Sequence, residues 1–104
     1  EGSKTYLLQF AVGVALARQQ QYSKAIDYLH NAIELQPDST WAHLEMGASL
    51  MKTGDYKSAA VHLEVAASRL PESTQTHALL AEAYDHLGRA DEAGRERAKA
   101  IQKR

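Results

Sequence analysis

The stretch that decides the fold is residues 40–73, TWAHLEMGASLMKTGDYKSAAVHLEVAASRLPES. Its apolar residues recur every three or four positions in two runs, which places them on one side of an α-helix in each run. Gly54 separates the two runs, and glycine accepts at little cost the left-handed conformation that ends a helix. Asp55 follows and can cap the second helix. The stretch is therefore predicted to form a helix-turn-helix.

The same pattern occurs on both sides of this stretch. Pro37 and Pro71 lie 34 residues apart, and each follows a helix-like run. The 34-residue shift also aligns Gly13 with Gly47, Leu16 with Leu50, Tyr22 with Tyr56, Ala25 with Ala59, Leu29 with Leu63 and Ala32 with Ala66. A third copy places Ala81, Tyr84, Gly88, Ala93 and Ala100 in these columns. The chain is predicted to form a single domain, 1–104, with repeats 6–39, 40–73 and 74–104.

Two helices fit each repeat. Ser39 and Ser73 are placed to cap the helices that follow the prolines. Gln20 stands where the other repeats have glycine, so the first turn should be less favourable. No structure is assigned to residues 1–3. The predicted helices are 5–19, 22–36, 40–53, 56–70, 74–87 and 90–102.

Small residues recur where two helices of a repeat should meet. Glycine or alanine at these columns lets the helices approach closely, while larger residues fill the surrounding space. The small residues are Gly13, Gly47 and Ala81 on the first helices and Ala25, Ala59 and Ala93 on the second, with Tyr22, Tyr56, Leu29 and Leu63 around them. A large side chain at Ala59 should therefore overpack the contact.

Composition excludes several classes of function. The 104 residues contain no cysteine, so disulfides, thiolate metal sites and cysteine nucleophiles are excluded. Twelve basic and thirteen acidic residues leave a net charge of −1, which gives no general attraction to nucleic acid or membrane. The most apolar stretch, 6–17, is shorter than the roughly 20 residues that cross a bilayer. We expect a soluble protein, and the cytoplasm is only the default assignment of its compartment.

The 34-residue helix-turn-helix pattern resembles the tetratricopeptide repeat, whose signature has small, aromatic and proline residues at these spacings. His43 and His77 occupy the column where the family usually has a large residue, and Trp41 lies two positions earlier. The resemblance implies an all-α fold, a right-handed α-solenoid of three helix-turn-helix repeats and six helices. The closest repeat is the second, through Trp41, Met46, Gly47, Leu50, Gly54, Asp55, Tyr56, Ala59, Leu63, Ala66 and Pro71.

In such solenoids the first helices line the concave side, which commonly receives a peptide or partner helix. The resemblance thus implies a protein-protein interaction scaffold. A ligand with a hydrophobic anchor and a basic segment would match an apolar N-terminal half and an acidic C-terminal half. A second interpretation is that the apolar residues pack on neighbouring repeats or another subunit. The implied groove residues are Leu7, Phe10, Ala11, Val14, Arg18, Trp41, Leu44, Glu45, Ala48, Met51, Lys52, Gln75, Ala78, Leu79, Glu82 and Asp85, with Met51 and His86 at the margin.

One branch of the family holds a peptide's C-terminal carboxylate with lysine, asparagine and arginine. A peptide carboxylate beside Glu45 would meet like-charge repulsion rather than a charge-assisted hydrogen bond. A carboxylate clamp is therefore not expected. The corresponding columns here hold Phe10, Val14, Glu45, Gln75 and Leu79.

The two ends of the repeat array differ. Helix 5–19 is apolar on several sides, which indicates earlier repeats or a covering chain, and self-assembly through this helix is an alternative function. The last helix has Gly94 and Arg97 in the columns of Ile26 and Leu29, as a solvated cap would. A basic docking patch for acidic protein or RNA is its alternative interpretation. Its other basic residues are Arg95, Lys99, Lys103 and Arg104.

Catalytic and metal chemistry are not expected. His43 and His77 share a column and should lie about 10 Å apart on successive helices, too far for one zinc ion. His30, His62 and His86 fall in other columns, without the His-Glu-x-x-His spacing. There is no glycine-x-serine-x-glycine elbow and no phosphate loop. We expect no cofactor and no enzyme; an accessory domain within a longer repeat array is the third functional hypothesis.

Overall fold

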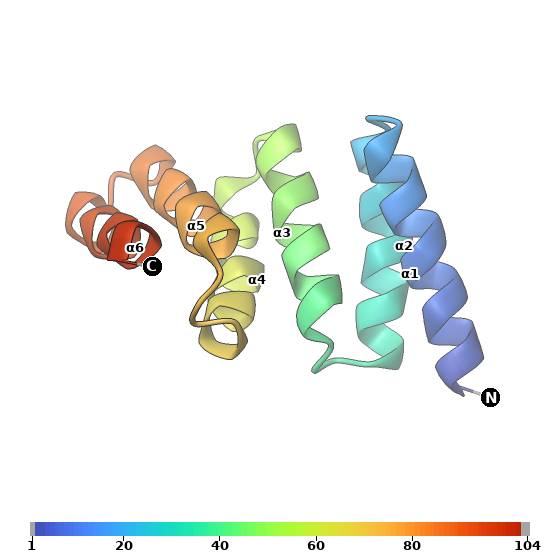
Figure 1. The fold of residues 1–104 in the computed structure, drawn as a ribbon. Helices are drawn as coiled ribbons and strands as arrows, with labels where there is room; N and C mark the ends of the chain where they lie inside the picture. Colours follow the sequence, from blue (N-terminus) through green and yellow to red (C-terminus); the bar gives the residue numbers. More distant parts are fainter. Residues whose placement is uncertain (1, 103–104) are drawn as a thin grey trace.

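The computed structural model describes residues 2–102, which form six α-helices and no β-strand (Figure 1). The expected all-α fold, a right-handed solenoid of helix-turn-helix repeats, is confirmed. Glu1, Lys103 and Arg104, which the predicted domain includes, lie outside the described residues. The helices are α1 (Gly2–Arg18), α2 (Tyr22–Leu35), α3 (Thr40–Thr53), α4 (Tyr56–Arg69), α5 (Thr74–His86) and α6 (Ala90–Gln102).

The predicted helix bounds agree with these to within one residue except at the N-terminus. There α1 begins at Gly2 rather than at residue 5, because neither proline nor a capping turn interrupts the helix in between. Residues 2 and 3, to which the sequence pattern assigned no structure, are therefore helical.

The helices stack as three antiparallel pairs, α1–α2, α3–α4 and α5–α6, hereafter the first, second and third pair (Figure 1). The stack measures 42 × 25 × 20 Å. Among the described residues, α1 approaches α3 and α3 approaches α5, whereas α2, α4 and α6 do not contact one another. The first helices of the pairs therefore converge and form the inner side of the curve.

Glycine allows the close approach within the first two pairs. A β-carbon on Gly47 would lie 2.5 Å from Cγ of Leu63, and one on Gly13 would lie 2.8 Å from Cγ of Leu29. Both leucines are fully buried, so each fills the space that its glycine leaves. This confirms the predicted role of Gly13 and Gly47.

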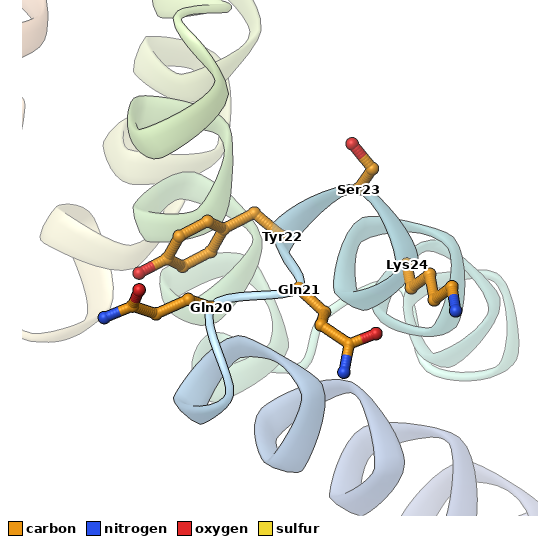
Figure 2. A pocket seen from close by; sticks show the side chains of 5 residues that line it. All are labelled: Gln20, Gln21, Tyr22, Ser23 and Lys24. Carbon is orange, nitrogen blue, oxygen red and sulfur yellow. The ribbon is translucent and has the colours of Figure 1, made fainter.

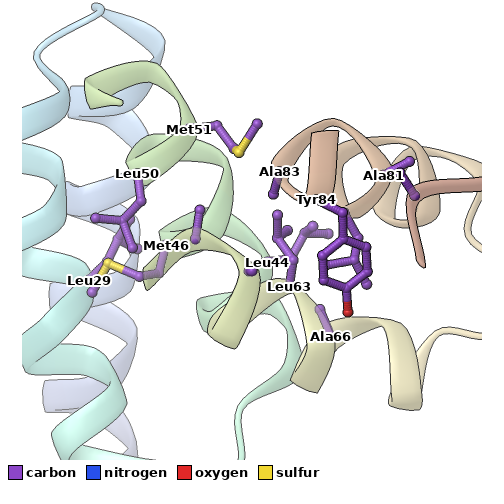
Figure 3. Packing of buried hydrophobic residues seen from close by; sticks show 14 of the residues in the cluster. Leu29, Leu44, Met46, Leu50, Met51, Leu63, Ala66, Ala81, Ala83 and Tyr84 are labelled. Atoms are coloured by element: carbon purple, nitrogen blue, oxygen red, sulfur yellow. The ribbon is translucent and has the colours of Figure 1, made fainter. Parts of the chain in front are cut away.

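One continuous apolar core connects the pairs (Figure 3). It runs from Leu29 of the first pair through Leu63 of the second to Leu80 of the third, all of them fully buried. Because each pair buries its neighbour's surface, the repeats support one another along the stack.

The turns are built as the sequence predicts. Ser39 accepts a hydrogen bond from the backbone N–H of Ala42, and Ser73 accepts one from Thr76. Asp55 accepts one from Ser58 at the start of α4. Three residues at the turns within pairs adopt positive φ, which is the left-handed conformation that favours glycine. They are Gln20 (φ 64°), Gly54 (φ 87°) and Gly88 (φ 75°).

Candidate functional site

The structure separates the predicted groove residues by their exposure. Two of them, Leu44 and Met51, are buried. Five are partly buried: Phe10, Val14, Glu45, Ala48 and Leu79. Nine are exposed: Leu7, Ala11, Arg18, Trp41, Lys52, Gln75, Ala78, Glu82 and Asp85.

Leu44 and Met51 are buried and belong to the continuous core (Figure 3). Their burial agrees with the second interpretation of the apolar columns, in which these residues pack within the repeat array.

Leu7 and Trp41 are large apolar side chains that stay exposed on the inner helices. They lie 34 positions apart, at equivalent places on α1 and α3, and each is 58% exposed. On α1, the rings of Tyr6 and Phe10 stack with centroids 5.8 Å apart. The Tyr6 hydroxyl lies 2.5 Å from the hydroxyl of Ser39, which ties the start of α1 to the α2–α3 turn.

The inner helices also carry separated charges. Glu45 on α3 and Glu82 on α5 form no ion pair among the described residues. Asp85, in contrast, pairs with Arg97 of α6. The predicted acidic half of the groove is therefore reduced to two unpaired carboxylates, because the last helix neutralises the third.

An aromatic network joins α4, α5 and α6 beside this surface. His86, which was expected at the groove margin, stacks on Tyr56 with ring centroids 3.8 Å apart. The hydroxyl of Tyr84 donates to Glu64 over 2.6 Å, and burial together with that carboxylate raises the pKa of Tyr84. Arg89 covers the Tyr84 ring at 4.5 Å from its centroid. These contacts fix the third pair against the second.

The side of α1 that faces away from the rest of the stack is exposed. The equivalent sides of α3 and α5 are covered by the preceding helix pair. Leu8 is 62% exposed, whereas Ala42 and Thr76 in the same column are fully buried by the preceding pair. Ala15 is exposed as well, whereas Ser49 and Ala83 in its column are buried. The structure thus places an apolar helix face at the N-terminal end of the stack.

The histidines are organised more closely than the sequence indicated. His43 and His77 are buried and hydrogen-bonded, in line with a structural role. Each also faces a side chain 19 positions later, His62 and Glu96 respectively, and these partners were missed. The spacing of 19 positions, which is the same for both contacts, is the sequence signal that could have identified these partners. Among residues 2–102 there is no group of three or more His, Cys, Asp or Glu residues that could hold a metal ion.

A pocket of about 310 Å³ lies at the α1–α2 turn (Figure 2). Its lining comes from five consecutive residues, so it is an open hollow beside one turn rather than an enclosed site between elements. It offers no pairing of a nucleophile with a base. The lining residues are Gln20, Gln21, Tyr22, Ser23 and Lys24.

In the part of the chain that the structure describes, no helix has both the length and the apolar character needed to cross a membrane.

Comparison with solved structures gives similar folds. A MamA variant superposes with a TM-score of 0.89 and 22% identity, covering 95% of this chain and 72% of that one. A crystal structure of MamA has a TM-score of 0.85 and 26% identity, covering 94% of this chain and 57% of that one. The first tetratricopeptide repeat domain of Spaghetti (RPAP3), bound to the HSP90 peptide SRMEEVD, has a TM-score of 0.87 and 16% identity, covering 96% and 79%.

No curated protein sequence matches the chain. The sequence pattern of the tetratricopeptide repeat matches residues 16–69 and 50–100, which together span most of the chain. With three stacked helix pairs and this match, the chain belongs to the tetratricopeptide repeat family.

Proposed function

We propose that this repeat domain is a protein-interaction scaffold that binds a peptide or partner helix on the concave surface of α1, α3 and α5. The observation that carries this proposal is the exposed pair Leu7 and Trp41 on adjacent inner helices. Large apolar side chains that stay exposed beside one another are typical of binding surfaces, and tryptophan is enriched at binding hot spots. The Spaghetti (RPAP3) domain, which has the same fold, holds a peptide.

The surface favours a ligand with an apolar anchor and a basic segment. The anchor would pack against Leu7 and Trp41, with the partly buried Phe10 behind them. The basic segment would lie along Glu45 and Glu82, which form no ion pair among the described residues. Since a peptide carboxylate beside Glu45 would meet like-charge repulsion, we do not propose a carboxylate clamp.

Intrinsic fluorescence provides a direct test, because Trp41 is the only tryptophan in the chain. We would titrate a panel of peptides that combine one aromatic or leucine anchor with a lysine-rich or glutamate-rich flank. Lysine-rich peptides should change the Trp41 emission and bind more weakly as salt rises. If no member of the panel changes the emission, the groove is not a peptide site of this kind.

Two variants locate the binding surface. Leu7→Glu should weaken peptide binding at least tenfold, because it places a charge in the apolar anchor site. Val61→Glu is its matched control, since Val61 is 56% exposed but lies on α4, outside the row of inner helices. Equal loss of binding in both variants would contradict the concave location.

A second candidate function is self-assembly through the open face of α1, and the uncovered column of Leu8 and Ala15 favours it. In such an assembly, a helix of the second copy would cover α1 in the way that α2 covers α3 within the chain. Leu8→Glu should then abolish self-association, whereas Leu7→Glu on the inner side should not. Light scattering at high micromolar concentration measures this, and a monomer without concentration dependence would exclude self-assembly.

A further inference from the structure

Two buried histidines occupy equivalent places but contact different chemistry. His43 on α3 and His77 on α5 each direct Nε2 at a proline carbonyl, that of Pro37 at 2.7 Å and that of Pro71 at 2.9 Å. The second ring nitrogen faces the neighbouring helix of the same pair. Nδ1 of His43 lies 2.9 Å from Nδ1 of His62, whereas Nδ1 of His77 lies 2.7 Å from Oε1 of Glu96.

These partners determine where the protons reside in each pair. A carbonyl oxygen only accepts, so Nε2 of His43 donates to Pro37. Nδ1 of the neutral His43 ring is then an acceptor, and His62 must donate to it from Nδ1. One added proton can be accommodated, because His62 can then carry its own proton on Nε2 and accept from Nδ1 of the His43 imidazolium. A second added proton would set one N–H against another, so the contact requires at least one of the two rings to be neutral.

The third pair has the opposite requirement. Both partners of His77, the Pro71 carbonyl and the Glu96 carboxylate, accept hydrogen bonds. An imidazolium ring donates from both nitrogens and satisfies both partners, while a neutral ring satisfies only one of them. Lys99 also pairs with Glu96, over 3.1 Å. Protonation of His77 therefore strengthens the contact between α5 and α6.

The groups around the His43–His62 contact do not compensate an added charge. From α2, His30 faces His62 and is itself paired with Glu34 at 3.1 Å. From α4, Arg69 donates to the Asp38 carbonyl in the α2–α3 turn. Among the described residues of α1 and α5, no charged group hydrogen-bonds or ion-pairs with either ring. Burial, followed by the imidazoles of His43 and His30, lowers the pKa of His62.

The sign of the linkage follows from that direction. The folded chain holds a proton on His62 less readily than the unfolded chain does, so acid favours unfolding. The contribution of this group to stability is complete above pH 6.5, the ordinary histidine value, and is lost as the pH falls towards the lowered pKa.

We propose that the second helix pair is an acid-sensitive element of the solenoid. Protonation of both rings of the His43–His62 contact opens the α3–α4 interface and frees the Pro37 turn, while the His77–Glu96 contact keeps the third pair closed. The two pairs thus differ in their response to acid, because His62 and Glu96 occupy equivalent positions but differ in chemistry.

Exchanging the partner residues tests this proposal. His62→Glu gives His43 a carboxylate partner like the one that His77 has in the third pair. Glu96→His gives His77 an imidazole partner like the one that His43 has in the second pair. Between about pH 7.5 and about pH 5.5 the Tm of the unaltered chain should fall by about 5 °C or more. His62→Glu should remove most of this fall, and Glu96→His should enlarge it.

His86→Gln is the control for these exchanges, because His86 is exposed and hydrogen-bonds with neither the His43–His62 nor the His77–Glu96 contact. It should leave the pH dependence of the Tm unchanged. If His62→Glu shows the same pH dependence as the unaltered chain, the proposal is overturned.

Imidazole ¹⁵N NMR tests the proton positions without any substitution. Nε2 of His43 should remain protonated, because it donates to the Pro37 carbonyl, and one proton should lie between Nδ1 of His43 and Nδ1 of His62 until both rings are protonated. As the pH falls, the signals of α3 and α4 should broaden or shift before those of α5 and α6. Changes that occur at the same pH in both helix pairs would refute the proposal.

Discussion

The first two helix pairs and the third differ in the residues that lie between the two helices of a pair. In the first and second pairs a glycine faces a buried leucine, as Gly47 faces Leu63. In the third pair these columns hold Ala81 and Arg97, and Arg97 turns outward to Asp85. Glycine is therefore needed only where a leucine fills the space between the helices, and the third pair exchanges that leucine for a surface ion pair.

The largest effect is expected from adding one carbon to the second pair. Gly47→Ala should lower the free energy of unfolding by about 1–3 kcal/mol, because the new β-carbon would lie 2.5 Å from Cγ of Leu63. Helix propensity alone predicts a higher free energy of unfolding, since alanine stabilises a helix by about 1 kcal/mol relative to glycine. Urea unfolding decides between the two outcomes. The double variant Gly47→Ala with Leu63→Ala should lose less than the sum of the single variants.

Ala59→Leu tests the facing side of the same interface. Ala59 is fully buried, so the larger side chain should cost about 1–3 kcal/mol through overpacking. The exposed Ala98 on α6 supplies a control, because Ala98→Leu should change the urea midpoint little. A midpoint for Ala59→Leu that equals that of the unaltered chain would contradict the close contact.

The turn of the first pair differs from the others by one residue, and Gln20→Gly should remove that difference. Gln20 holds φ at 64°, where a side chain costs about 1 kcal/mol relative to glycine. The substitution should raise the free energy of unfolding by about that amount, while Gly54→Ala should lower it. Thermal unfolding of both variants measures the effect, and a less stable Gln20→Gly would show that the Gln20 side chain supports the turn.

Local chemistry made most of the fold predictable from sequence. The caps at Ser39 and Asp55 and the turn at Gly54 depend on neighbours within a few residues, so spacing alone located them. The site was less predictable. Leu44 is buried in the core that connects the helix pairs, and Asp85 is neutralised because Arg97 reaches it from α6. Both outcomes depend on packing between helices, which the apolar pattern of one helix does not record.

The smallest effect is expected at the Asp85–Arg97 pair. Both side chains are about half exposed, at 48% and 49%, and exposed ion pairs typically contribute about 0.2–1 kcal/mol. Arg97→Gln should therefore reduce stability by less than Gly47→Ala does, and added salt should shrink the difference. Unfolding measured at low and high salt separates the charge effect from packing. A loss as large as that of Gly47→Ala, unchanged by salt, would show that the stem of Arg97 packs in the third pair as leucine does in the other two.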